Sequence, residues 1–323
     1  MKKIGIFVLS VLLIVMFWQF DFASFIINIK KVPLLAFAGL LLIQIFSQLL
    51  VNYQWCRIGK VMGGEHSFFK MLYVNARGMI IESITPGVKI GGEVTRGILL
   101  KNDLNYSTRE AATLVTIQKM VSLFSFFLVN LFAFAHISNR IDLFNGAILK
   151  VIIYLFIIVL IGILIVVFAF TASFEKRVSM IVPKRKWTGA LQGYALTLLS
   201  SIKMLKSIKG EIYKQFLLSL SIWMLFPLKM ILLTQLFTTN FDPVYLTEVT
   251  FISYMVGMIP LLPGGIGSFE ATMTSLLVAM QIDHNAALAI TLLFRFITFW
   301  FVIIISLLYV GIWKIGGKKD ESH

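Results

Sequence analysis

Long apolar stretches separated by short polar segments make up most of the chain. Runs of this kind predict membrane-crossing helices at about residues 4–20, 32–53, 111–136, 146–172, 215–237 and 286–313. A helix needs about 20 predominantly apolar residues to cross the hydrocarbon core of a bilayer, and these runs approach or exceed that length. The pattern therefore predicts an all-α polytopic membrane protein with about six full transmembrane helices.

Two further apolar segments, at about 68–100 and 248–280, are interrupted by proline and glycine. Proline removes a helical hydrogen bond and glycine permits positive φ, so each helix is expected to break there. We expect both segments to return to the side they left, as re-entrant hairpins or paired short helices. The first would enter from the cytoplasm and the second from outside.

Composition excludes a soluble protein. Hydrophobic residues form 59% of the chain and charged residues only 14%, with 29 Phe. A soluble domain has about 45–50% apolar and about 25% charged residues, and it could not bury this much apolar surface.

The distribution of positive charge predicts the orientation. The 173–214 loop carries nine Lys and Arg, whereas the 238–247 loop has Asp242 and neither Lys nor Arg. Cytoplasmic loops are enriched in Lys and Arg, so we expect the first loop inside, the second outside, and both termini in the cytoplasm. The protein is then a multi-pass protein of the cell (inner or cytoplasmic) membrane. We attribute the net charge of +14 to the Lys and Arg residues that orient the protein in the membrane. Nucleic acid is therefore not an expected partner.

Lys2 and Lys3 before the first apolar run resemble the start of a signal peptide. The stretch Trp18 to Asp21 is not a small-residue cleavage site, so an uncleaved first helix is expected.

An amphipathic helix is predicted at about 188–209, within the basic loop. Its apolar positions recur at helical spacing, and lysines are offset from them; they are Leu191, Ala195, Leu198, Ile202 and Leu205, with Lys203, Lys206 and Lys209. Such a helix lies in the membrane interface with its lysines at the level of the headgroups.

The two broken segments share a motif. In both, Pro-Gly is followed by further glycine and by a glutamate seven residues after the proline: Pro86 to Glu93, and Pro263 to Glu270. A helix that restarts after the glycines presents free N–H groups and its positive dipole end, which suits an anion. Paired discontinuous segments in the two halves of a membrane protein point to a transport site near the midplane.

Ionisable residues near the breaks complete a candidate substrate site. The candidate residues are Gly91, Gly92, Glu93, Arg96, Pro263, Gly264, Gly265, Gly267, Glu270 and Arg295. Glu93 and Arg96 are one helical turn apart and can pair on one face. A charge in mid-span, such as Arg295, rarely persists without a partner or a cavity. Two interpretations stay open: Arg295 forms a structural salt bridge with Glu270, or it faces a cavity that binds an anionic headgroup.

Other polar residues inside apolar runs are less specific. Gln44, Gln48 and Asn52 recur every four residues and form a polar stripe, either between helices or along a pathway. We expect Lys119 and Lys229 to extend their ammonium groups towards the interface.

The two glycine motifs and the arginine in the last helix resemble the transmembrane region of lysylphosphatidylglycerol synthases, also called the flippase-like domain family. The resemblance covers about residues 4–315. In multiple peptide resistance factor proteins, this region is fused to a soluble aminoacyl-transfer domain and moves the modified lipid between leaflets. Here no such domain follows Trp313, so lysyl transfer is not expected. The resemblance implies a lipid-translocating scaffold without naming the lipid.

The first functional hypothesis is therefore a flippase or scramblase-like transporter for an anionic phospholipid or a lipid-linked cell-envelope intermediate. It would not be an enzyme and would need no cofactor or metal, since Cys56 is the single cysteine and the four histidines lack metal-binding spacing. Expected partners are a membrane phospholipid or polyprenyl-linked lipid and other envelope-biosynthesis proteins; the sequence also allows a homo-oligomer. The alternatives are a membrane-embedded transferase acting on a lipid carrier, and a non-catalytic subunit of an envelope-synthesis complex.

The predicted topology can be tested by cysteine accessibility. In a background without Cys56, a cysteine at Lys101 should react with an impermeant maleimide only from the cytoplasmic side, and one at Asp242 only from outside. Labelling of both positions from the same side would contradict the assigned orientation of the first broken segment.

Overall fold

The computed structural model describes residues 27, 30, 32–85, 90–137, 147–183, 185–207, 209–239, 241–259 and 263–320. Throughout these ranges the regular elements are helices, with no strand, which confirms the all-α prediction. The expected first helix, at 4–20, lies outside the described residues.

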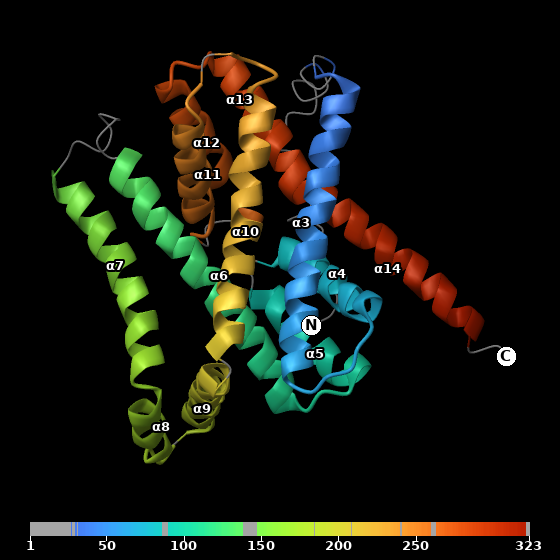
Figure 1. Cartoon of the computed structure of the whole chain (residues 1–323), viewed down its shortest axis with the longest axis vertical. Coiled ribbons are helices and arrows are strands. Elements are labelled where there is room, and N and C mark those ends of the chain that lie inside the picture. Colours follow the sequence, from blue (N-terminus) through green and yellow to red (C-terminus); the bar gives the residue numbers. More distant parts are fainter. Residues whose placement is uncertain are drawn as a thin grey trace. The chain divides into compact units, whose positions relative to one another are not determined.

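The helices follow one another through short connections (Figure 1). They are α3 (Leu34–Val61), α4 (Phe68–Ile84), α5 (Ile90–Leu104), α6 (Thr108–Ile137), α7 (Ala147–Ala169), α8 (Thr171–Ser179), α9 (Lys186–Ser207), α10 (Lys209–Thr234), α11 (Pro243–Gly257), α12 (Ser268–Ala279), α13 (His284–Arg295) and α14 (Phe301–Asp320). A short 3₁₀ turn, η2 (Pro263–Gly265), precedes α12, and a π-helix, η3 (Phe296–Trp300), joins α13 to α14.

Four helices of the described chain are long and apolar enough to cross a membrane: Leu34–Val61, Thr108–Ile137, Gly210–Thr234 and His284–Ile315. They lie where the sequence predicts spans at 32–53, 111–136, 215–237 and 286–313. The span expected at 146–172 corresponds to α7, which is followed by α8 after a bend of 80°. If α7 and α8 are counted together as one span, the described residues contain up to five membrane spans. The total of six spans remains a prediction.

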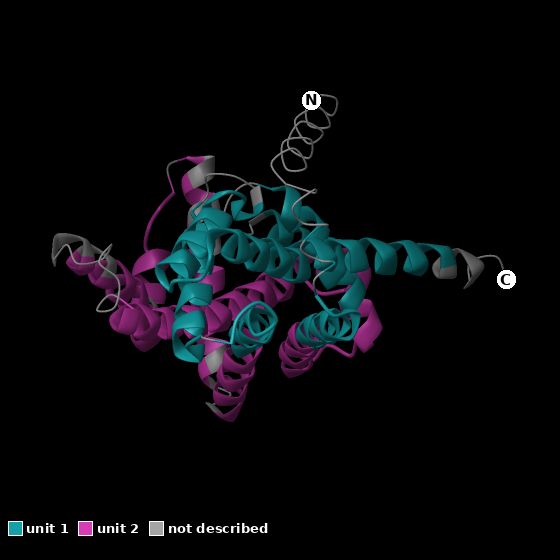
Figure 2. Cartoon of the chain, turned by 90° about the horizontal axis from the view of Figure 1, so that it is seen from above, with its two compact units in different colours: residues 1–49, 72–95, 224–323 teal, residues 50–71, 96–223 magenta. Residues whose placement is uncertain are grey.

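The chain divides into two compact units, shown in different colours in Figure 2. Unit 1 comprises residues 1–49, 72–95 and 224–323, and unit 2 comprises residues 50–71 and 96–223.

In unit 1, α11 packs along α12 and α12 packs against α13. The core between them is apolar and includes Leu246, Phe251, Phe269, Leu277 and Phe294. In unit 2, α6 packs against α7 and α9, and α8 packs against α9. Phe126 and Trp223 meet inside unit 2 with ring centroids 4.7 Å apart, and the Trp223 indole N–H donates to the Ser122 carbonyl at 3.1 Å.

The exposed surface of α7 supports a membrane location. This helix is apolar almost throughout its 23 residues, and large side chains such as Leu155, Phe156 and Ile163 are more than half exposed. Exposed apolar area on this scale is rare on soluble monomers and marks contact with a membrane or another protein.

Both broken segments contain breaks where the sequence predicts them. In the first, α4 ends at Ile84 and α5 begins at Ile90. In the second, α11 and α12 have 15 and 12 residues and run side by side (Figure 1). At about 1.5 Å per residue, neither reaches the about 30 Å of a bilayer core. The second segment is therefore a hairpin of two helices that are each too short to span.

The amphipathic helix expected at 188–209 is α9. It packs against α6 and α8, with Leu199 and Ile202 buried. Lys203 lies on the exposed side, as the offset of the lysines predicted.

The turn between α11 and α12 depends on glycine. Gly264, Gly265 and Gly267 have φ of 65°, 70° and 83°, a region that side chains rarely adopt. A Cβ on Gly265 would also overlap the carbonyl oxygen of Gly257, at the end of α11. The backbone of the turn at Gly265 therefore lies very close to the backbone of α11 at Gly257.

A glycine-to-alanine series should separate strain from overlap. Gly265→Ala adds both, and we expect it to lower the free energy of unfolding by about 2 kcal/mol or more. Gly267→Ala adds positive-φ strain with nothing within 4 Å, so about 1 kcal/mol is expected. Gly39→Ala, in an open helical position, is the control and should not destabilise. Equal effects at Gly265 and Gly39, measured by denaturant unfolding in micelles, would contradict the hairpin geometry.

Candidate functional site

Arg295, at the end of α13, is the centre of the candidate site. Its Nε lies 3.0 Å from Oε1 of Glu270 on α12, and its Nη2 donates to the carbonyl of Gly264 in the turn. The guanidinium lies between two rings, 4.7 Å from the centroid of Phe269 and 4.2 Å from that of Phe299. Arg295 is only 4% exposed. Four contacts within unit 1 thus hold this cation.

Glu270 divides its carboxylate between two tasks. One oxygen pairs with Arg295, while Oε2 accepts from the backbone N–H of Gly267 at 2.6 Å. The second contact caps the first turn of α12, where a negative charge also complements the helix dipole. The anion site that a restarted helix offers is therefore occupied here by the chain's own carboxylate.

The π-helix after Arg295 widens the last span at the level of the site. It covers Phe296–Trp300 and carries Phe299, whose ring contacts Arg295. Short π-helical segments inside α-helices are rare and are frequent at functional sites. A Cβ on Gly264 would meet the ring of Phe299 at 2.7 Å, so Gly264 is needed for the turn to reach this ring.

The structure therefore brings together Gly264, Gly265, Gly267, Glu270 and Arg295, and Pro263 begins the η2 turn between them. The structure contains the Glu270–Arg295 salt bridge, which was one of the two interpretations of Arg295. It joins the second hairpin to the last span. A role of Arg295 in binding a headgroup remains a prediction.

Glycines of the first break have a packing role in unit 1. A Cβ on Gly92 would come within 2.8 Å of the Gly78 carbonyl and 2.7 Å of Glu82 Cβ, both on α4. A Cβ on Gly91 would overlap the side chain of Thr85. Gly92 thus allows α5 to approach α4 closely, and Gly91 leaves room for Thr85, which follows α4.

The charged residues of the first break lie on α5. Glu93 is in its first turn. Arg96, in unit 2, places its guanidinium 5.7 Å from the ring centroid of Trp55. Pairing of Glu93 with Arg96 remains a prediction.

Lys229 corrects one expectation. It was expected to reach the interface, but its side chain is fully buried in unit 1, at 0% exposure. Its ammonium donates to Oε1 of Gln44 and to Oγ of Ser47 at 3.3 Å, and lies 4.2 Å from the ring centroid of Phe226. The side chain does not extend because α3 supplies these acceptors deep in the unit. Gln44 of the polar stripe therefore joins two helices.

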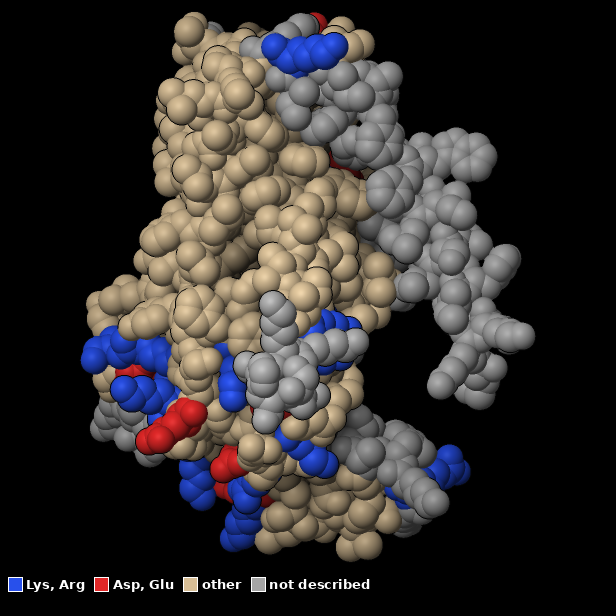
Figure 3. Space-filling model, turned by 90° about the vertical axis from the view of Figure 1, so that its right-hand side faces the viewer, with Lys and Arg blue, Asp and Glu red and all other residues tan. Residues whose placement is uncertain are grey.

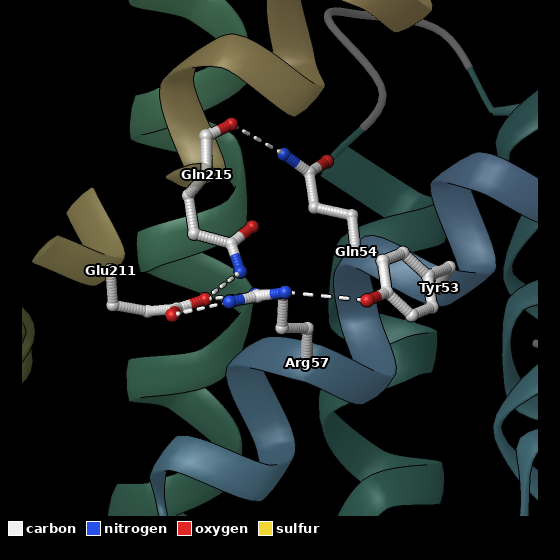
Figure 4. A network of polar contacts seen from close by, with 5 residues as sticks. All are labelled: Tyr53, Gln54, Arg57, Glu211 and Gln215. Carbon is white, nitrogen blue, oxygen red and sulfur yellow. Dashed lines mark hydrogen bonds and ion pairs between the residues drawn. The ribbon is translucent and has the colours of Figure 1, made fainter. Parts of the chain in front are cut away.

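A second network in unit 2 was not predicted from the sequence (Figure 4). Arg57 on α3 forms a two-pronged ion pair with Glu211 on α10, with Nη2 2.8 Å from Oε2. Gln215 donates to Glu211 at 2.9 Å, and Gln54 donates to the Gln215 carbonyl at 3.3 Å. Arg57 also donates to the Tyr53 hydroxyl at 3.3 Å.

Sequence signals for these networks were present but indirect. Arg57 is one basic residue among several, and Glu211 lies 154 positions away, so only the fold pairs them. For Lys229, the sequence signal is a cation in mid-span, and only the fold places Gln44 of the polar stripe beside it.

A polar cavity of about 470 Å³ lies in unit 2 next to His66 and Tyr106. The Tyr106 hydroxyl and His66 Nε2 are buried without a hydrogen-bond partner, and their rings are 4.6 Å apart. Burial raises the pKa of Tyr106 to about 12. Burial, and then the nearby Lys70, lower the pKa of His66 below its usual value.

Within the described residues, no group of three or more His, Cys, Asp and Glu could hold a metal ion. The fold and site thus define a helical membrane protein in which a broken hairpin is joined to a long span by an ion pair to a buried arginine.

The family described as the lysylphosphatidylglycerol synthase TM region matches residues 3–306, so the chain belongs to this family. A UPF0104 membrane protein of Methanothermobacter thermautotrophicus is 26% identical over 253 residues, 74% of this chain and 73% of the relative. A UPF0104 membrane protein of Pyrococcus horikoshii is 24% identical over 337 residues, 99% and 98% of the two chains. No solved structure matches this chain.

A double-mutant cycle tests the ion pair at the site. Because Arg295 is buried, Glu270→Gln, which removes its carboxylate partner, should lower the free energy of unfolding by about 3 kcal/mol. Arg295→Met should lower it by less, because it leaves a partly exposed Glu270 that keeps its contact to Gly267. The double variant should lose clearly less than the sum of the single losses. The control pair is Thr274→Val with Thr291→Val, which removes an uncharged hydrogen bond of 3.1 Å between the same helices. A coupling no larger than in this control would contradict the ion pair.

Proposed function

We propose that the chain moves an anionic phospholipid, or a lipid-linked cell-envelope intermediate with a phosphate, between the leaflets of the cell membrane. The second hairpin would be the centre of the site, with Arg295 as the residue that binds the phosphate. The observation that carries this proposal is the ion pair of the buried Arg295 with the partly exposed Glu270, which lies on a broken hairpin of short helices.

Energetics support a functional role for this pair. A charge at the bilayer centre costs about 2.5–3.5 kcal/mol on insertion scales, and apolar residues of similar volume are often as stable as a buried ion pair. The pair joins a turn with positive φ at three glycines to a π-helical segment. Short π-helical segments of this kind are frequent at functional sites.

The contacts of Glu270 support a specific mechanism. A lipid phosphate can take the place of the Glu270 carboxylate at Arg295, since the planar guanidinium binds both groups through the same fork. Gly267 and Glu270 would keep α12 capped until the exchange, and the return of Glu270 to Arg295 would release the headgroup. The acyl or prenyl chains would stay in the surrounding lipid throughout.

This proposal also covers orientation and partners. Both termini would lie in the cytoplasm, and other envelope-biosynthesis proteins would supply or consume the lipid. The chain would act without a cofactor and would not be an enzyme.

Leaflet translocation in proteoliposomes tests this function. With headgroup-labelled anionic phospholipids and a polyprenyl-phosphate sugar, we expect flux that depends on the protein. It should fall by about tenfold or more, which corresponds to about 1.4 kcal/mol, in Arg295→Ala and in Glu270→Gln. Arg295→Ala removes the group that would bind the phosphate. Glu270→Gln keeps the cap of α12, but the neutral glutamine could not displace the headgroup from Arg295.

Thr274→Val is the matched control, because it alters the same helix pair without removing a charge. It should retain flux close to that of the wild type. Each variant must also elute as a folded protein in size-exclusion chromatography. Flux that is unchanged in folded Arg295→Ala would contradict the assignment of the site, and absence of protein-dependent flux for every lipid of the panel would contradict transport of these lipids.

A further inference from the structure

A second hollow, of about 650 Å³, lies in unit 2 between the start of α6 and the helices α8 and α9. Three cations line it, Arg109, Lys176 and Lys203, with the single carboxylate of Glu175. Lys203 Nζ and Glu175 Oε2 are 3.4 Å apart, and both side chains are partly exposed, so this pair is weak. The hollow therefore keeps an excess of positive charge.

Arg109 contributes to the excess of positive charge in the hollow. It lies in the first turn of α6, a helix of 30 residues, where the dipole presents its positive end. Glu110 of the same turn is engaged with Ser107, whose backbone N–H donates to its carboxylate at 2.8 Å. Glu110 thus caps the start of α6 and does not line the hollow, so Arg109 is the charged residue of this turn that lines it.

Cross-contacts hold the walls of the hollow together. Gln192 on α9 donates to the carbonyls of Val178 and Ile181 at 2.8 and 2.7 Å. Lys206 donates to the Ala169 carbonyl at 3.2 Å. The hydroxyls that line the hollow, on Ser179, Thr197 and Ser200, already donate to helix carbonyls. The cations are therefore the groups that remain to bind a ligand.

Exposed apolar residues flank the same hollow. Phe170, Met180, Ile181 and Val182, at the two ends of α8, are 56–81% exposed. Basic residues beside exposed apolar residues, on amphipathic helices, are typical of segments that lie in the membrane interface. In the face drawn in Figure 3, Lys and Arg likewise gather in patches beside wide uncharged surface. A free phosphate in solution would make no use of the apolar residues.

We propose that this hollow binds the phosphate of an anionic lipid headgroup, with Arg109, Lys176 and Lys203 as ligands and the acyl chains beside α8. Basic pockets between membrane helices bind anionic headgroups in this way. The inference goes beyond the proposed function, because it concerns binding at a place separate from Arg295 and requires no translocation.

Native mass spectrometry of the full chain in mixed micelles tests the proposal. The probes are dioleoylphosphatidic acid, dioleoylphosphatidylcholine and inorganic phosphate. We expect the anionic lipid to be retained over the zwitterionic one, and Lys176→Gln with Lys203→Gln to weaken its retention by about tenfold or more. Glu175→Gln should strengthen retention, because it removes the only carboxylate of the hollow.

The control is Arg177→Gln with Arg185→Gln, which removes the same charge from the same basic segment but from exposed residues that do not line the hollow. It should leave retention nearly unchanged. Equal loss in both double variants would overturn the proposal in favour of general attraction by a basic segment. Displacement of the lipid by equimolar inorganic phosphate would overturn the lipid as occupant. Translocation is not measured, so this result is independent of the flux experiment.

Discussion

A charge buried among apolar helices must have partners, and this constraint shapes the second half of the chain. Arg295 meets it through a carboxylate, a backbone carbonyl and two aromatic rings, all within unit 1. Three of these contacts come from the turn and from α12, so the arginine determines how the hairpin meets the last span. The glycines at positive φ then allow the backbone to come close enough for the contacts to form.

Glu270 makes two contacts at once, because its carboxylate ties the start of α12 to the arginine of α13. In the proposed exchange, this carboxylate would give up Arg295 while the helices themselves stay formed. Lys229 is a buried cation whose partners, Gln44 and Ser47, are both neutral. These partners join two helices, but neither is an anion that a phosphate could replace. Arg57 and Glu211 form a third arrangement, an ion pair near the ends of their helices.

Local signals in the sequence predicted the helices and both breaks. Apolar runs predicted the long helices, Pro-Gly motifs predicted the ends of α4 and α11, and the offset lysines predicted α9. The ion pair of Glu270 with Arg295 was also accessible, since both are charges inside apolar segments. The prediction for Lys229 is wrong, because the exposure of a mid-span lysine depends on which helix packs against it. The Arg57–Glu211 contact joins helices that are distant in sequence, and the basic hollow combines α8 and α9 with the more distant α6, so local patterns predict neither.

In the proposed exchange, a lipid phosphate takes the place of Glu270 at Arg295. Infrared difference spectroscopy measures this exchange directly, because the stretching bands of a carboxylate shift when it leaves a guanidinium. Addition of dioleoylphosphatidic acid to the reconstituted protein should shift a band that is missing from Glu270→Gln, whereas dioleoylphosphatidylcholine should leave it in place. A Glu270 band that stays unchanged at saturating anionic lipid would contradict the exchange and leave the ion pair a purely structural link.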